Sequence, residues 1–166
     1  MVKNGMLHLT DELQIHRDFT YSDFAKTNLA IFDINAHNNK IGDEYNIVHL
    51  KENILYGSLL CKLHLFFKNG YIHYVEITNP SYKSVLFELD SDVEFIDEKI
   101  FRIKCLDEIS TIFNKTPPFL IDDIYISIDE DIHSGLVCFD FTFFDFIEYQ
   151  KTGVRKPYTG RRLWEI

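Results

Sequence analysis

The residues best suited to chemistry lie between two strand-like runs in the second half of the chain. Asp129, Asp131 and His133 place an oxygen or imidazole donor at every second position. A calcium loop with such donors also needs glycine at its sixth position and glutamate at its twelfth. Counted from Asp129, these positions hold Ser134 and Asp140. The spacing therefore predicts a solvated hairpin loop and no metal site.

Other carboxylates show no catalytic spacing. Asp140 and Asp145 are five residues apart, so a regular strand would point them to opposite faces. Asp122 and Asp123 are adjacent, and we interpret them as a turn rather than as an acid and base pair. The motifs GxSxG, HExxH, GxxxxGK[ST] and GxGxxG do not occur. We therefore predict no catalytic residues and no cofactor.

Two further candidate metal ligands, His64 and His73, fall in the clearest predicted hairpin, which covers residues 59–78. Asn69-Gly70 between two alternating runs is typical of a hairpin turn. A two-residue loop would mix charge into the apolar row, whereas a three-residue loop makes one face almost wholly apolar, so we predict the latter. In that register the two histidines lie on opposite faces and cannot share a metal. The predicted cross-strand pairs include Lys62–Glu76, His64–Tyr74, Leu65–His73 and Leu63–Val75.

The other elements follow from hydrophobic periodicity and turn residues. Residues 6–9 and 13–16 predict a small opening hairpin, and residues 20–27 predict a helix capped by Thr20. Short strands are predicted at 29–34, 47–50 and 85–89, with a surface loop at 35–46. Alternating runs at 124–128 and 137–143 predict a second strong hairpin with an acidic loop.

The segment from Asp92 to Lys115 is ambiguous. A single helix would put Arg102 in the middle of the apolar stripe and turn Ile100 away from it. We therefore favour a strand to about Lys104, followed by a helix over about residues 106–115. The prolines after this helix would end it.

Composition limits the fold and the partners. The 166 residues suit one domain, and 15 Phe and 9 Tyr indicate a bulky core. We predict an α+β domain over residues 1–150, mainly antiparallel sheet built from hairpins with one to three short helices packed on it. A basic tail, 151–166, follows. Three cysteines without a CxxC pair are expected to be small buried hydrophobes.

The net charge of −9 bears on localisation and partners. Because nucleic-acid binding depends on Lys and Arg displacing counterions, the acidic middle of the chain disfavours direct contact with DNA or RNA. The same field would speed the encounter with a basic partner. The sequence has no signal-peptide pattern and no apolar run long enough to span a membrane, so we expect a cytoplasmic protein without membrane contact.

The predicted layout resembles small acidic immunity proteins of bacterial polymorphic and contact-dependent toxin systems. The resemblance is carried by the early helix at residues 19–24, the hairpin at 65–72 and the later hairpin at 126–141. It implies a non-catalytic cytoplasmic inhibitor of a cognate toxin, often a basic nuclease. The residues that we expect to contact this basic protein partner are Asp122, Asp123, Tyr125, Asp129, Glu130 and Asp131.

Two other functions stay open. One is a small enzyme or small-molecule-binding protein with a pocket under the aromatic sheet, in which His73, His133 and Asp140 would converge. The other is an assembly module that associates through exposed strand edges.

Overall fold

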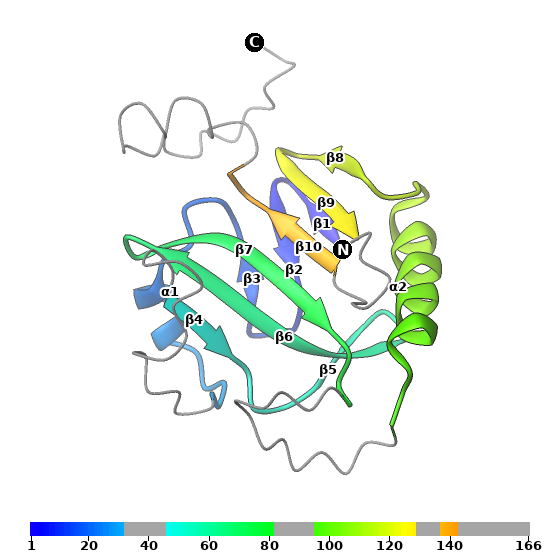
Figure 1. Cartoon of the computed structure of the whole chain (residues 1–166). Coiled ribbons are helices and arrows are strands. Elements are labelled where there is room, and N and C mark those ends of the chain that lie inside the picture. The colour runs from blue at the N-terminus through cyan, green and yellow to red at the C-terminus, as the bar shows by residue number, and fades with distance from the viewer. Residues whose placement is uncertain (32–45, 82–94, 129–136, 143–166) are drawn as a thin grey trace.

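The computed structural model describes residues 1–31, 46–81, 95–128 and 137–142 (Figure 1). They form an α+β domain with a three-stranded sheet, a seven-stranded sheet and two helices, one of them short, as predicted. The predicted strand at 85–89, the acidic loop and the basic tail lie outside the described residues. The elements are β1 (Val2–Lys3), β2 (Met6–His8), β3 (Gln14–Ile15), α1 (Tyr21–Ala25), β4 (Asn46–His49), β5 (Ile54–Tyr56), β6 (Leu59–Lys68), β7 (Tyr71–Thr78), α2 (Glu98–Phe113), β8 (Phe119–Ile121), β9 (Ile124–Ile128) and β10 (Val137–Asp140).

The N-terminal sheet has the order β1-β2-β3. The hairpin predicted at residues 6–16 is confirmed, since Leu7 faces Ile15 across the antiparallel strands β2 and β3. Leu7, Leu13 and Ile15 are fully buried in the core that this sheet shares with the larger one. The strand predicted at 29–34 is reduced, within the described residues, to a single bridge between Ile31 and Leu50.

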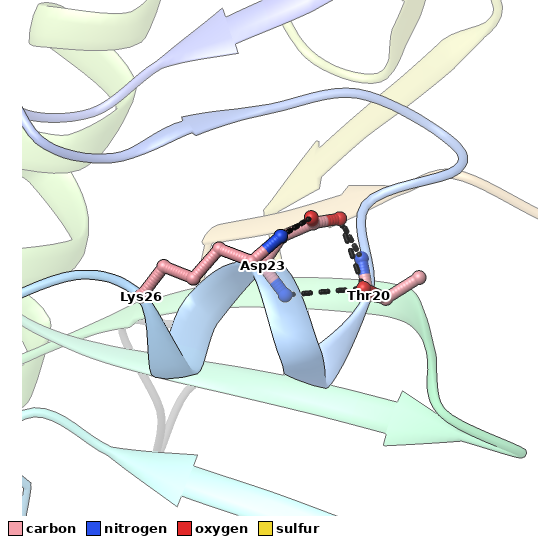
Figure 2. Close-up of polar contacts among 3 residues, drawn as sticks. All are labelled: Thr20, Asp23 and Lys26. Carbon is pink, nitrogen blue, oxygen red and sulfur yellow. Dashed lines mark hydrogen bonds and ion pairs between the residues drawn. The ribbon is translucent and has the colours of Figure 1, made fainter.

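The predicted early helix is confirmed as α1, and its first turn is held by a capping box (Figure 2). The Thr20 hydroxyl accepts a bond from the Asp23 backbone N–H at 3.1 Å, and the Asp23 carboxylate accepts one from the Thr20 N–H at 2.9 Å. The bond from the Thr20 N–H contributes most to lowering the pKa of Asp23, followed by a bond that the Thr20 hydroxyl donates to the same carboxylate at 2.9 Å. A five-residue helix cannot persist alone. It is tied to the large sheet because the Tyr21 N–H donates to the carbonyl oxygen of Gly70 at 2.8 Å.

The large sheet has the order β4-β6-β7-β10-β9-β8, with β5 also paired to β6, and all pairs are antiparallel. The predicted three-residue loop between β6 and β7 is wrong. Lys68 faces Tyr71 across a two-residue turn, and Asn69 and Gly70 have φ values of 51° and 82°. Two positive φ angles give the turn a twist that matches the strands.

A β-bulge explains why the side-chain pattern pointed to the wrong loop. The register shifts between Phe66 and Phe67, and His73 is the additional residue in β7. Beyond the bulge Leu65 faces Val75, and apolar residues again oppose apolar residues. In a regular ladder without a bulge, the extra residue can only belong to the loop. The alternating side chains therefore pointed to a three-residue loop.

The individual pairs change with the register. Glu76 faces His64 and Lys62 faces Thr78, so the predicted Lys62–Glu76 pair is wrong. The predicted partners of His64, Leu65 and Leu63 are wrong for the same reason.

The strand predicted to about Lys104 is also wrong, because α2 begins at Glu98. The Asp97 carboxylate caps the helix by accepting bonds from the N–H groups of Lys99 at 3.0 Å and Ile100 at 3.4 Å. The helix ends at Asn114, which is left-handed with φ 53°. The helix cap formed by Asp97 therefore determines the local structure more strongly than the alternation of apolar and basic residues over 101–105.

The last hairpin is confirmed, with β9 and β10 antiparallel and Ile126 facing Phe139. Strands β1, β5 and β8 were not predicted. β8 joins β9 through Asp122 and Asp123, whose φ values are 47° and 69°, so the predicted turn at these residues is correct.

One face of the large sheet, together with β1–β3 and α2, encloses the core. In Figure 1, α2 stands at the side of the sheets near β8 and β9, and it contacts β6 and β9. Two of the three cysteines, Cys61 and Cys105, are buried in the core as predicted, whereas Cys138 is half-buried. The core residues with no exposed surface include Leu63, Leu65, Phe67, Val75, Ile77, Phe101, Ile109, Ile126, Val137 and Phe139.

A polar clasp joins the end of β7 to the start of α2. The Asn79 side-chain amide donates to the Ile96 carbonyl at 2.7 Å, and the Ile96 N–H donates to the Ser81 hydroxyl at 2.8 Å. The Ser81 N–H in turn donates to Asn79 Oδ1 at 3.0 Å. Asn79 and Ser81 are both buried, so the clasp satisfies polar groups that water cannot reach.

Candidate functional site

The predicted partner-binding residues fall in different environments. Asp122 and Asp123 are buried at the β8–β9 turn. The Asp122 carboxylate accepts a bond from the Gly5 N–H at 3.2 Å, and Asp123 interacts electrostatically with the buried Arg17. Both carboxylates therefore hold the small sheet against the large one. Tyr125 is half-buried on β9, and Asp129, Glu130 and Asp131 lie outside the described residues.

Helix α2 instead presents large apolar side chains to solvent. Ile100, Ile103 and Leu106 are 52%, 54% and 40% exposed. At 3.6 residues per turn, their spacing of three places them along one side of the helix. The buried residues Phe101 and Cys105 lie on the other side. We call Ile100, Ile103 and Leu106 the α2 ridge.

Apolar exposure continues just before the helix. Phe95, two residues before the Asp97 cap, is 79% exposed. Exposed Lys99, Lys104 and Asp107 flank the α2 ridge, so its polar margin carries both charge signs. An apolar centre with a polar margin is typical of a protein-binding surface.

The turn between β5 and β6 fixes the orientation of α2. The Ser58 N–H and hydroxyl donate to the two carboxylate oxygens of Glu108, at 2.9 and 2.6 Å. The bond from the Ser58 hydroxyl contributes most to lowering the pKa of Glu108, followed by the bond from its N–H. This contact holds the buried side of the helix toward the sheet and leaves the α2 ridge outside.

Gly57 makes this contact possible, and its substitution provides a test. Its φ is +64°, and a Cβ atom there would overlap the Glu108 carboxylate and crowd Ile112. We expect Gly57→Ala to reduce the free energy of unfolding by about 2 kcal/mol, since left-handed backbone alone costs an L-residue roughly 1–2 kcal/mol. Urea denaturation measures the loss. Gly70→Ala is the matched control, because Gly70 has a similar φ of +82° with open space around it. An equal loss in both variants would show that the Glu108 contact adds nothing.

A second concentration of polar groups lies on the half-buried face of the large sheet. His49 in β4 faces His64 in β6, and their Nδ1 atoms are in hydrogen-bond contact. His64 Nε2 lies 2.8 Å from the Thr78 hydroxyl oxygen. This pair was missed because only the pairing of β4 with β6 brings His49 to His64.

Burial keeps these imidazoles uncharged. It is the main reason that the pKa of His49 falls to about 4 and that of His64 to about 3. The positive charge of Lys62 lowers both pKa values further. The Lys62 ammonium itself donates to the Lys51 carbonyl oxygen at 2.9 Å.

The residues expected to converge in an enzymatic pocket are engaged elsewhere. Asp140 Oδ1 accepts bonds from the N–H and hydroxyl of Thr142, both at 2.7 Å, within a local turn. His73 is buried with its ring edge-on to Tyr74. His133 lies outside the described residues.

No protein-family model, curated protein or solved structure matches the chain. Among the described residues, none of the helices combines the length and apolar character that crossing a membrane requires. The same residues contain no group of three or more side chains able to hold a metal ion.

Proposed function

We propose that the chain is a non-catalytic protein-binding inhibitor, an immunity protein that neutralises a cognate toxin by docking through the α2 ridge. The observation that carries the proposal is the exposure of Ile100, Ile103 and Leu106 on one side of a well-anchored helix. A soluble helix ordinarily places polar residues on that side. Contiguous exposed apolar side chains instead mark interaction surfaces.

The energetics favour a partner over solvent. Burying a side chain of this size yields roughly 1.5–3 kcal/mol relative to leaving it exposed. Because these three side chains are 40–54% exposed after folding, roughly half of this free energy per side chain remains available for association. The helix loses little order on binding, since Asp97 and Glu108 already fix its start and its orientation.

The net charge of −9 supports a basic partner, such as the nuclease-type toxins that the predicted layout suggests. A negative field speeds the encounter with a basic protein and repels nucleic acid. In this proposal the α2 ridge provides the affinity, while the charge provides the association rate. Asp129, Glu130, Asp131 and Tyr125 stay predicted contacts of the same partner.

The proposal predicts that Ile103→Glu abolishes protection while leaving the fold intact. A hot-spot residue at the centre of an interface contributes 2 kcal/mol or more, so binding to the cognate toxin should weaken at least about 30-fold. Calorimetric titration and rescue of growth in cells that express the toxin measure the effect. The free energy of unfolding should change by no more than about 0.5 kcal/mol, because Ile103 is exposed.

Thr111→Glu is the matched control, since it adds the same charge at an exposed position of the same helix. It should bind and protect like the wild type. Full protection by Ile103→Glu would contradict docking through the α2 ridge. Failure of the wild-type chain to bind or protect would contradict the inhibitor function itself, and a stable homo-oligomer that Ile103→Glu dissociates would favour an assembly module instead.

A further inference from the structure

The pair formed by His49 and His64 has no part in the proposed function. The two rings project from directly opposed positions of neighbouring strands. Their centroids are 4.5 Å apart with the planes at 77°, and the Nδ1 atoms face each other. Both side chains are half-buried. Two imidazole nitrogens thus converge on one point of the large sheet.

Thr78 gives this pair a feature that is typical of metal-binding histidines. A metal-ligating imidazole almost always donates its other ring N–H to a nearby acceptor, which fixes the tautomer and the ring orientation. His64 Nε2 has such an acceptor in the Thr78 hydroxyl at 2.8 Å. With the proton on Nε2, the lone pair of His64 Nδ1 is directed toward His49.

We propose that His49 and His64 form a two-histidine site for a divalent transition-metal ion such as Zn²⁺, Cu²⁺ or Ni²⁺, bound between their Nδ1 atoms. Imidazole nitrogen suits these ions, whereas Mg²⁺ and Ca²⁺ prefer oxygen. Without metal, one Nδ1–H donates to the other Nδ1. For the ion to enter, the two rings turn apart so that each Nδ1 can form a bond of about 2.0–2.1 Å to the metal. The proton of His49 then moves from Nδ1 to Nε2, both rings stay neutral and the pair releases no proton. Solvent fills the remaining coordination positions.

Lys62 determines how strongly the site binds. Its ammonium is close enough to act electrostatically on both histidines and is held by the Lys51 carbonyl oxygen at 2.9 Å. A positive charge in this position repels a metal cation. On the neighbouring strand Glu76 faces His64. Removing the charge of Lys62 should therefore strengthen metal binding.

Calorimetric titration of the chelator-treated full chain with NiCl₂, CuCl₂ and ZnSO₄ tests the site. We expect one ion per chain, with Cu²⁺ binding most tightly of the three. His64→Gln should weaken binding by at least about 10-fold, and Thr78→Val by about 10-fold, as is common when a supporting hydrogen bond is lost. Thr78→Ser keeps the hydroxyl and should bind like the wild type. Lys62→Met should bind more tightly.

His8→Gln is the control for metal binding by other histidines, and it should leave the affinity unchanged. Electron paramagnetic resonance of the Cu²⁺ complex of the wild-type chain should show two coupled nitrogen nuclei, a result that needs no variant to fold. The proposal is overturned if the wild-type chain binds no ion, if its Cu²⁺ spectrum lacks nitrogen coupling, or if Thr78→Val and Thr78→Ser bind equally well. Circular dichroism confirms that each variant is folded.

Discussion

Phe67→Ala should reduce the free energy of unfolding by about 3–5 kcal/mol, the range for removing a large aromatic side chain from a core. Phe67 has no exposed surface. Its ring lies 5.6 Å from that of Tyr21 and 6.5 Å from that of Phe24, measured between centroids. The substitution therefore leaves a cavity where the large sheet meets α1. Because a domain has only about 5–15 kcal/mol of stability, a large share of it would be lost.

Urea denaturation followed by circular dichroism measures this effect. Phe95→Ala is the matched control, because it removes the same side chain from a position that is 79% exposed. It should change the free energy of unfolding by no more than about 0.5 kcal/mol. Similar losses in the two variants would contradict the assignment of Phe67 to the core.

The second large effect is acid destabilisation by the histidine pair. The folded-state pKa values are about 4 for His49 and about 3 for His64, below the ordinary value of 6.5. Below pH 6.5 the unfolded chain therefore binds protons that the folded chain does not. Stability is complete above pH 6.5 and falls as the pH drops toward 4. By linkage we expect a loss of about 2–4 kcal/mol at pH 5.

This loss can be separated from that of the carboxylates. The pKa values of Asp23 and Glu108 are lowered from 3.8 and 4.5, so their contributions disappear at lower pH. Urea denaturation between pH 7 and 5, in buffer with a chelator, measures the loss. Burial also lowers the pKa of the Met1 amine to about 6, so the difference between variants isolates the imidazoles. The double variant His49→Gln, His64→Gln should have a flatter profile, whereas His8→Gln should retain the slope. An unchanged slope in the double variant would rule out the pair as its cause.

Local signals in the sequence predicted much of the fold. Thr20 and Asp23 satisfy each other's backbone N–H groups within four residues, so a single sequence was enough to place α1. The hairpin formed by β9 and β10 was equally visible, because its side chains alternate without interruption. These elements depend on neighbours in the sequence.

The errors have physical causes that lie outside a short window. His73 adds one residue to β7, and nothing in a binary pattern distinguishes a bulge from a longer loop. The alternation of Phe101, Ile103 and Cys105 indicates a strand if Ile103 must be buried. In the structure Ile103 is 54% exposed, so the assumption failed at a residue of the α2 ridge. Local rules often fail at functional surfaces, and here the failure marks the surface that we propose for binding.

The candidate sites were the least predictable part. Asp122 and Asp123 carry charge in the sequence but are buried by contacts with the distant Gly5 and Arg17. The convergence of His49 and His64 depends on which strands become neighbours. Both outcomes are set by tertiary pairing, which spacing along the chain does not reveal.

The clasp between Asn79, Ser81 and Ile96 indicates where the chain tolerates changes in length. Its hydrogen bonds hold the end of β7 beside the start of α2, whatever number of residues separates them. In general, each doubling of the number of residues in a loop adds only about 0.6 kcal/mol to the entropic cost of joining its ends. We therefore expect residues inserted between positions 81 and 96 to leave the clasp in place. One residue added to the turn at Asn69 and Gly70 would instead change the register of two central strands.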